Sequence, residues 1–185
     1  MRVTVEAGAM GLPFEESLAR EGYTLGHFPS SIVCSTVGGW IAGRSAGQCS
    51  SLYGKIEDMV ESVECVLGTG ELVTLSRGSS GPSLVPLIVG SEGTLAIVTA
   101  ATLRIHEAPK ARVFASYTFS STEDGFRALR LLMQSGARPA VARLYDPFDA
   151  MLARRGSVRA GADIEDDEAP PVPHERPPGF GATLL

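Results

Sequence analysis

Two alternating apolar segments, residues 60–67 and 72–75, are joined by the short sequence Gly68-Thr69-Gly70. Alternation with a period of two sends successive side chains to opposite faces of a strand, and a glycine-containing turn of this length joins neighbouring strands. The chain is therefore expected to contain a β-hairpin with one buried and one largely solvent-exposed face.

Further elements are expected before and after this hairpin. Residues 3–6 alternate like a short strand, and a helix is expected to begin near Pro13 and to end at Gly22. Residues 95–105 are rich in β-formers, and two strands with a turn are predicted there.

From residue 110 the pattern changes to a β-α-β unit. Residues 113–119 and 141–145 are predicted strands, and between them Ser121 and Asp124 resemble a capping box that opens a helix ending at Gly136. Residues 154–185 contain small residues, an acidic run and many prolines, a composition that is typical of disorder.

Charge and hydropathy exclude several classes of partner. The 185 residues carry a formal net charge of -5 and no cluster of Lys or Arg, so nucleic acid is not an expected partner. No apolar run approaches the ~18 residues of a membrane span, and the N-terminus lacks the apolar stretch of a signal peptide. We therefore expect a cytoplasmic chain with no transmembrane segment.

Cysteine and histidine spacing gives no sign of a metal centre. The 3 cysteines are odd in number and widely separated, and the 3 histidines are scattered along the chain. Neither a disulfide framework nor a metal site is expected.

Two glycine-containing segments are candidates for ligand contacts. Ser35–Ala42 places two hydroxyls and two glycines before an apolar stretch, a composition that lets backbone N–H groups approach a phosphate. Gly90–Leu95 is suited either to turning the chain at a sheet edge or to contacting a ligand. From the local sequence alone, a purely structural turn is the favoured interpretation of each segment.

A hydrolase is the remote alternative. Gly43–Gly47 matches the G-x-S-x-G pattern, which would make Ser45 a nucleophile. His106 and His174 are its candidate bases, but the order of acid and histidine along the chain is poor and the residues after Ser45 are weak helix formers. No catalytic residue is assigned.

Four motifs, taken in their order along the chain, resemble a known protein family, although none of them is specific on its own. They are Gly26–Pro29, Ser35–Ala42, Tyr53–Val60 and Gly90–Leu95. In this order they resemble the FAD-linked oxidases of the vanillyl-alcohol oxidase and p-cresol methylhydroxylase superfamily, in the branch that includes alkyldihydroxyacetonephosphate synthase. The resemblance covers roughly residues 2–150.

The resemblance implies an α+β fold: the second half of a two-part FAD-binding (PCMH-type) domain, followed by the start of an α+β cap domain. The expected boundaries are 1–108 for the FAD-binding part, 109–153 for the cap and 154–185 for the tail. In this family a first FAD segment with a glycine-rich loop would precede Val3, and the catalytic part of the cap would follow residue 150.

The same resemblance implies noncovalent FAD and a set of cofactor-binding residues. The loop up to Thr36 would line the pyrophosphate and flavin, Gly43–Ala46 would lie against the flavin, and Glu92–Ala96 would lie near the adenosine. The full set is Ser30, Ser31, Ser35, Thr36, Gly38, Gly39, Gly43, Arg44, Ser45, Ala46, Ile56, Glu92, Gly93, Thr94, Leu95, Ala96 and Ile97.

The expected function is therefore the FAD-binding portion of a flavin-dependent oxidoreductase or of an alkyldihydroxyacetonephosphate synthase-like enzyme. The intact enzyme would act on a small molecule, a hydroxy acid or an alkyl-glycerone-phosphate type of substrate. The alternative is a noncatalytic remnant, or a subunit whose site is completed by a partner chain. Exposed apolar surface would favour that alternative.

Overall fold

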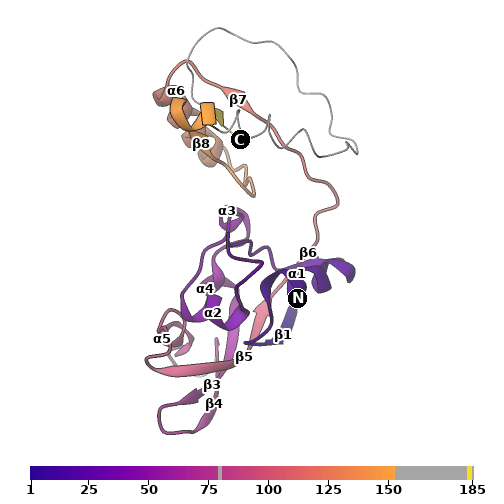
Figure 1. Ribbon diagram of the computed structural model, residues 1–185, viewed down its shortest axis with the longest axis vertical. Helices are drawn as coiled ribbons and strands as arrows, with labels where there is room; N and C mark the ends of the chain where they lie inside the picture. The colour runs from indigo at the N-terminus through magenta and orange to yellow at the C-terminus, as the bar shows by residue number, and fades with distance from the viewer. Residues whose placement is uncertain (79–80, 153–182, 185) are drawn as a thin grey trace. The chain divides into compact units, whose positions relative to one another are not determined.

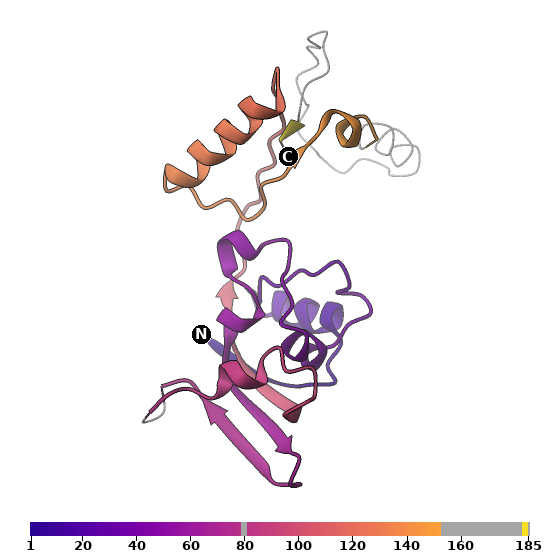
Figure 2. The same ribbon diagram turned by 90° about the vertical axis from the view of Figure 1, so that its left-hand side faces the viewer.

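The computed structural model describes residues 1–78, 81–152 and 183–184. The chain divides into two compact units (Figures 1 and 2). The first unit comprises Met1–Arg112 with Pro139–Val141, and the second comprises Val113–Arg138 and the described residues from Ala142 onward.

The first unit is built on a four-stranded antiparallel sheet with the strand order β1-β5-β3-β4. Its strands are β1 (Arg2–Glu6), β3 (Val60–Leu67), β4 (Leu72–Ser76) and β5 (Ala96–Arg104). The predicted hairpin is confirmed as β3 and β4, and the predicted first strand is confirmed as β1. The antiparallel sheet and its helices make the fold α+β, as expected.

The two faces of this sheet follow the alternation read from the sequence. Val5 and Val63 both pair with Ala101 of β5, and these three side chains face the core. On the other face Thr4 pairs with Thr102, and their hydroxyl groups form a hydrogen bond of 3.0 Å. One face is therefore apolar and covered, while the other is polar.

Short helices cover the apolar face. They are α2 (Val37–Ala42), α4 (Ile56–Met59) and α5 (Val85–Ile88), and α3 (Ser50–Tyr53) lies in the loop between α2 and α4. Trp40, Ile56 and Val85 belong to the same buried cluster as the inner side chains of the sheet. The first unit thus has one layer of sheet and one of helices, with the core between them.

The helix near the N-terminus of the first unit packs against a separate two-stranded sheet. Helix α1 (Gly11–Arg20) is the helix predicted at Pro13, and it contacts β2 (Tyr23–Thr24), which pairs with β6 (His106–Glu107). The buried carboxylate of Glu15 in α1 accepts a hydrogen bond from the Thr24 hydroxyl and one of 3.1 Å from the Leu25 N–H. Such bonds satisfy a carboxylate that would otherwise be costly to bury.

The prediction of two strands and a turn within residues 95–105 is wrong, because the segment forms the single strand β5. β5 pairs with β1 on one side and with β3 on the other. As one continuous strand it forms backbone hydrogen bonds along both of its edges. The irregularity of the segment appears as register shifts against β3, between Val60 and Ser62 and between Glu64 and Cys65.

The second unit contains α6 (Thr122–Gln134) and the three-stranded sheet β7-β9-β8. The predicted capping of this helix is confirmed, because the Asp124 N–H donates to the Ser121 hydroxyl at 3.1 Å. Two apolar side chains of this helix are exposed: Phe126 is 63% exposed and Met133 is 51% exposed.

The strands of the second unit are shorter than predicted. Only Tyr117–Thr118 (β7) and Leu144–Tyr145 (β8) are extended and paired, and both pair with Thr183–Leu184 (β9), which offers only two residues to each neighbour. The expectation of a disordered tail falls mainly on residues 153–182 and 185, which lie outside the described residues. Within that tail, Thr183–Leu184 form a strand.

Candidate functional site

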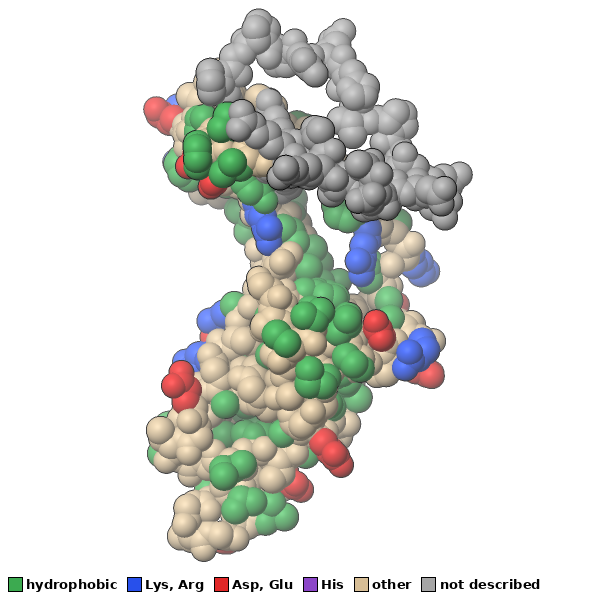
Figure 3. Space-filling view, in the orientation of Figure 1, with side chains coloured by type: hydrophobic (Ala, Val, Ile, Leu, Met, Phe, Trp, Pro, Cys, Tyr) green, Lys and Arg blue, Asp and Glu red, His purple; other side chains and the backbone are tan. Residues whose placement is uncertain are grey.

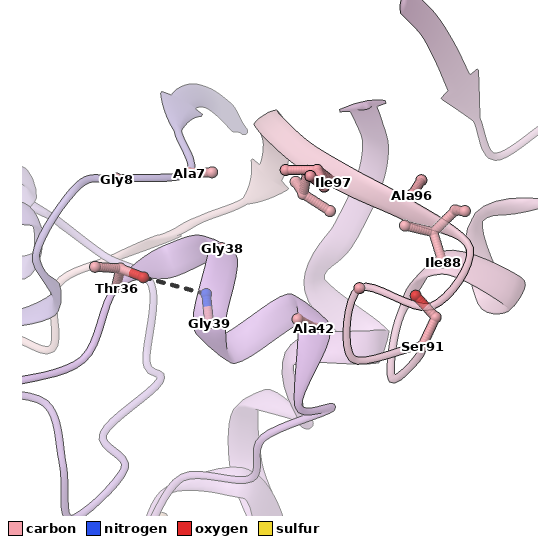
Figure 4. A pocket seen from close by; sticks show the side chains of 12 residues that line it. Ala7, Gly8, Thr36, Gly38, Gly39, Ala42, Ile88, Ser91, Ala96 and Ile97 are labelled. Carbon is pink, nitrogen blue, oxygen red and sulfur yellow. Dashed lines mark hydrogen bonds between the residues drawn. The ribbon is translucent and has the colours of Figure 1, made fainter. Parts of the chain in front are cut away.

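A pocket of about 370 Å³ lies in the first unit where α2 faces the start of β5. Figure 4 shows Gly38, Gly39 and Ala42 of α2 on one side and Ala96 and Ile97 of β5 on the other, with Ile88 beside them. We call this the α2–β5 pocket. Its lining residues are Ala7, Gly8, Thr36, Gly38, Gly39, Ala42, Ile88, Ser91, Gly93, Ala96, Ile97 and Val98.

The N-terminus of α2 is tied closely to β1 and its turn. The Thr36 hydroxyl caps the helix by accepting from the Gly39 N–H at 3.2 Å, and the Gly38 N–H donates to the Ala7 carbonyl at 2.8 Å. A Cβ atom at Gly38 would lie 2.7 Å from the Cβ of Ala7. The glycine therefore permits close packing, and the Gly38 and Gly39 N–H groups are already bonded within the protein.

The loop before α2 is held by serine hydroxyls. Ser35 accepts a hydrogen bond from the indole N–H of Trp40 at 2.8 Å and donates to the Ser31 carbonyl at 2.7 Å. Ser30 and Ser31 are exposed on this loop. The buried Trp40 ring thus anchors a loop whose outer serines face solvent.

The turn from Gly90 to Leu95 forms the opposite wall of the pocket. The Thr94 hydroxyl closes the turn by donating to the Ser91 carbonyl at 2.6 Å. Glu92 adopts a positive φ of 50°, and its N–H donates to the Ala42 carbonyl at 3.1 Å. The turn is therefore bonded directly to the end of α2.

The G-x-S-x-G segment does not form a nucleophile elbow. The residues before it, 37–42, form a helix where the elbow requires a strand. Ser45 does meet a histidine, because its hydroxyl lies 2.7 Å from Nε2 of His27. This partner is neither of the histidines considered from the sequence, and it precedes the serine in the chain.

His27 is completely buried and packs edge-on against Trp40, with 4.8 Å between ring centroids. Its Nδ1 atom has no hydrogen-bond partner among the described residues, so no carboxylate orients the ring as in a catalytic triad. Burial lowers the pKa of His27 from 6.5 to about 4, because desolvation disfavours the charged ring. The His27–Ser45 pair is therefore a neutral hydrogen bond, and the hydrolase hypothesis has no supporting geometry.

The structure brings only some of the predicted cofactor residues together. Those that line the α2–β5 pocket are Thr36, Gly38, Gly39, Gly93, Ala96 and Ile97. Those that do not line it are Ser30, Ser31, Ser35, Gly43, Arg44, Ser45, Ala46, Ile56, Glu92, Thr94 and Leu95. Ile56 is fully buried in the core, where it has a packing role.

The sequence reasoning missed half of the pocket lining. The missed residues are Ala7, Gly8, Ala42, Ile88, Ser91 and Val98. Ala42 and Ser91 lie inside motifs that were already recognised, and Gly8 follows a predicted strand, so these three had a usable signal. The other three are small or apolar residues that the sequence does not distinguish from core residues.

The lining suits part of a planar aromatic cofactor. Apolar side chains dominate, hydroxyls come from Thr36 and Ser91, and a Cβ built on Gly8 or Gly93 would meet nothing within 4 Å. Open glycines allow a ligand to approach the backbone closely. The volume is at the low end for ligand pockets, so the pocket would hold part of FAD.

Other site classes have no support among residues 1–78, 81–152 and 183–184. No group of three or more His, Cys, Asp or Glu side chains could hold a metal ion there. In the same part of the chain, no helix has the length and apolar character needed to cross a bilayer. On the face shown in Figure 3, basic and acidic side chains are scattered rather than gathered in one patch.

Comparisons with known proteins agree with the motif order. Residues 1–76 match a family model described as an FAD binding domain. The FAD-linked oxidoreductase YgcU of Escherichia coli K12, named as uncharacterized, is 39% identical over 153 residues, covering 80% of this chain and 32% of the relative. Alkyldihydroxyacetonephosphate synthase of Dictyostelium discoideum is 37% identical over 167 residues, covering 89% of this chain and 27% of the synthase.

A solved alkyldihydroxyacetonephosphate synthase structure has the same fold over the matched region. The TM-score is 0.74 at 37% identity, with 83% of this chain and 28% of the synthase covered. The chain thus spans about a third or less of the length of these relatives.

Proposed function

Since this chain carries an FAD-binding domain and is related to FAD-linked oxidoreductases and alkyldihydroxyacetonephosphate synthases, we propose that it forms part of the FAD site of a flavin-dependent enzyme. The observation that carries this proposal is the α2–β5 pocket, which the predicted motifs Ser35–Ala42 and Gly90–Leu95 border together. The bound FAD would be held noncovalently and would supply the electron chemistry.

The chain's own residues would bind and orient the cofactor. Thr36 and Ser91 offer hydroxyls for its polar edges, while Ile88 and Ile97 offer apolar contact to a ring. The open backbone at Gly8 and Gly93 would let that ring lie close to the chain. The remaining predicted cofactor residues, including the exposed Ser30 and Ser31 hydroxyls, stay predictions.

We further propose that residues 1–108 are the second part of a two-part FAD-binding domain and that 109–153 begin a cap domain. In that arrangement the substrate would be a small molecule, and its identity would depend on the cap.

FAD titration of the purified chain tests the proposal, with flavin fluorescence and melting temperature as readouts. At an FAD concentration of about 100 times the dissociation constant, binding should add roughly 2.7 kcal/mol to the free energy of unfolding. Gly8→Val places a branched side chain at the pocket, where a Cβ meets no other atom, and should weaken FAD binding at least tenfold.

Gly68→Val is the matched control for that variant. Gly68 also has open space around a built Cβ and no positive φ, but it lies outside the pocket, in the β3–β4 turn. Equal affinity of both variants, or no FAD binding either by the chain alone or after the complementary segment of an FAD-binding domain is added, would contradict the proposal.

A second candidate is a subunit or noncatalytic remnant whose FAD site is completed by a partner chain. Large apolar side chains near the pocket favour this candidate: Leu87 is 58% exposed, Leu95 is 53% exposed and Ile97 is 68% exposed. This candidate predicts that FAD binds only when the complementary segment of an FAD-binding domain is added. Full-affinity binding by the chain alone would argue against it.

A further inference from the structure

Arg44 occupies an unusual position immediately after α2. It has a positive φ of 49°, which is uncommon for a residue other than glycine, and its side chain reaches across to the end of α5. One guanidinium nitrogen, Nη2, donates to the Val89 carbonyl at 2.7 Å and to the Pro86 carbonyl at 3.2 Å. Nε lies 3.3 Å from a carboxylate oxygen of Glu57.

Backbone hydrogen bonds join the same two segments. The Gly90 N–H donates to the Ile41 carbonyl at 2.9 Å, and the Glu92 N–H donates to the Ala42 carbonyl at 3.1 Å. A Cβ at Gly90 would lie 2.7 Å from Nε of Arg44, so the glycine leaves room for the guanidinium. The side chain therefore lies against the seam where the end of α2 meets the chain after α5.

This seam separates two walls of the α2–β5 pocket. Ala42 lines the pocket from α2, and Ile88 and Ser91 line it from the other side. Any change in the distance between the end of α2 and the segment 88–91 changes the width of the pocket. Arg44 itself is not among the lining residues.

We propose that Arg44 is a positioning residue, whose guanidinium fixes the spacing between the two walls of the α2–β5 pocket by holding the Pro86 and Val89 carbonyls. The planar fork of arginine can serve two carbonyls and a carboxylate at once, whereas the ammonium of lysine acts as a point charge. Nη2 and Nε are engaged within the protein, and Arg44 does not line the pocket, so in this proposal the side chain acts on a ligand through the pocket wall rather than by pairing with its phosphate. Only the ligand part of this inference rests on the proposed function.

Hydrogen exchange of the ligand-free chain tests the positioning role. In Arg44→Met the amides of Gly90 and Glu92 should exchange about tenfold faster than in the wild type, while those of Val63 and Cys65 in the central strand β3 keep their rates. Arg127→Met is the matched control, because the ion pairs that Arg127 forms with described residues lie on the surface of α6, and it should leave all four rates unchanged.

Unchanged exchange at Gly90 and Glu92, or an equal acceleration in β3, would overturn the inference. Should Arg44→Met fail to fold, Arg44→Lys answers the same question, because it keeps the charge near Glu57 but lacks the fork. The same selective acceleration is expected, and wild-type exchange in Arg44→Lys would overturn the role of the fork.

FAD titration at several salt concentrations tests the ligand part. Arg44→Met should raise the dissociation constant for FAD about tenfold, with the same salt dependence as the wild type. A reduced salt dependence would mean that Arg44 pairs with the pyrophosphate directly, since salt screens such an ion pair, and would overturn the inference. If the wild type binds no FAD even after the complementary segment of an FAD-binding domain is added, the proposed function fails while the exchange experiment still decides the role of Arg44.

Discussion

Acidification should destabilise this fold through His27 before most carboxylates are protonated. The pKa of His27 is lowered to about 4 in the folded chain, and its ordinary value of 6.5 applies when the chain unfolds. Between these values the unfolded chain binds a proton that the folded chain does not, so stability is complete above about pH 6.5 and falls as the pH approaches 4. At pH 4.5 the expected loss is about 2.5 kcal/mol, from ~1.4 kcal/mol per pKa unit.

Urea unfolding of the wild type and of His27→Gln over pH 4.5–7.5 measures this effect. The variant has no titrating group at this position. The free energy of unfolding of the wild type minus that of the variant should therefore fall by about 2.5 kcal/mol between pH 7.5 and pH 4.5. Carboxylates such as Glu61, whose pKa is lowered by its hydrogen bond to Arg104, titrate in both proteins and cancel in the difference.

His106→Gln is the comparison variant. Burial also lowers the pKa of His106, but its side chain is only half-buried, so its pH-dependent contribution should have the same sign and be smaller than that of His27. Parallel pH profiles for wild type and His27→Gln would refute the reasoning, because they would mean that His27 is protonated in the folded chain near its ordinary pKa.

Three further substitutions test the packing and the caps. Gly38→Ala should destabilise the first unit and lower its melting temperature, because the new methyl group would lie 2.7 Å from the Cβ of Ala7 and neither backbone can move without breaking a 2.8 Å hydrogen bond. Val63→Ala should cost roughly 2 kcal/mol in urea unfolding, because Val63 is completely buried and the change leaves a cavity; a loss below about 0.5 kcal/mol would argue against this core. Ser121→Ala should cost about 1 kcal/mol by removing the cap of α6, which circular dichroism would report as lost helicity, whereas Ser120→Ala should have little effect because Ser120 caps no N–H group.

Much of the fold could be predicted from the sequence because it depends on local patterns. Alternation placed β3 and β4, and the residues around Ser121 placed the start of α6. The order of the four motifs indicated FAD, in agreement with the FAD-binding family model and the related oxidoreductases and synthases. These signals work because side-chain periodicity and capping chemistry act over a few neighbouring residues.

The sequence could not predict which strand lies at the centre of the sheet or which residues meet across the pocket. β5 remains one strand because β1 and β3, far from it along the chain, bond to both of its edges. Gly38 was a candidate for phosphate contact in the sequence, but its N–H is bonded to Ala7 in the folded chain.

The sequence alone determined the α+β fold class of this protein, the polar and apolar faces of its β-hairpin and its relationship to FAD-binding proteins. The tertiary structure decided that Thr36, Gly93 and Ile97 share one pocket, that His27 is buried beside Ser45, and that Arg44 joins the end of α2 to the chain after α5. The physical reason is that the His27–Ser45 and Arg44–Val89 hydrogen bonds join residues 18 and 45 positions apart, and the pocket brings Thr36 together with residues more than 50 positions away, so only the packed sheet and helices place them together.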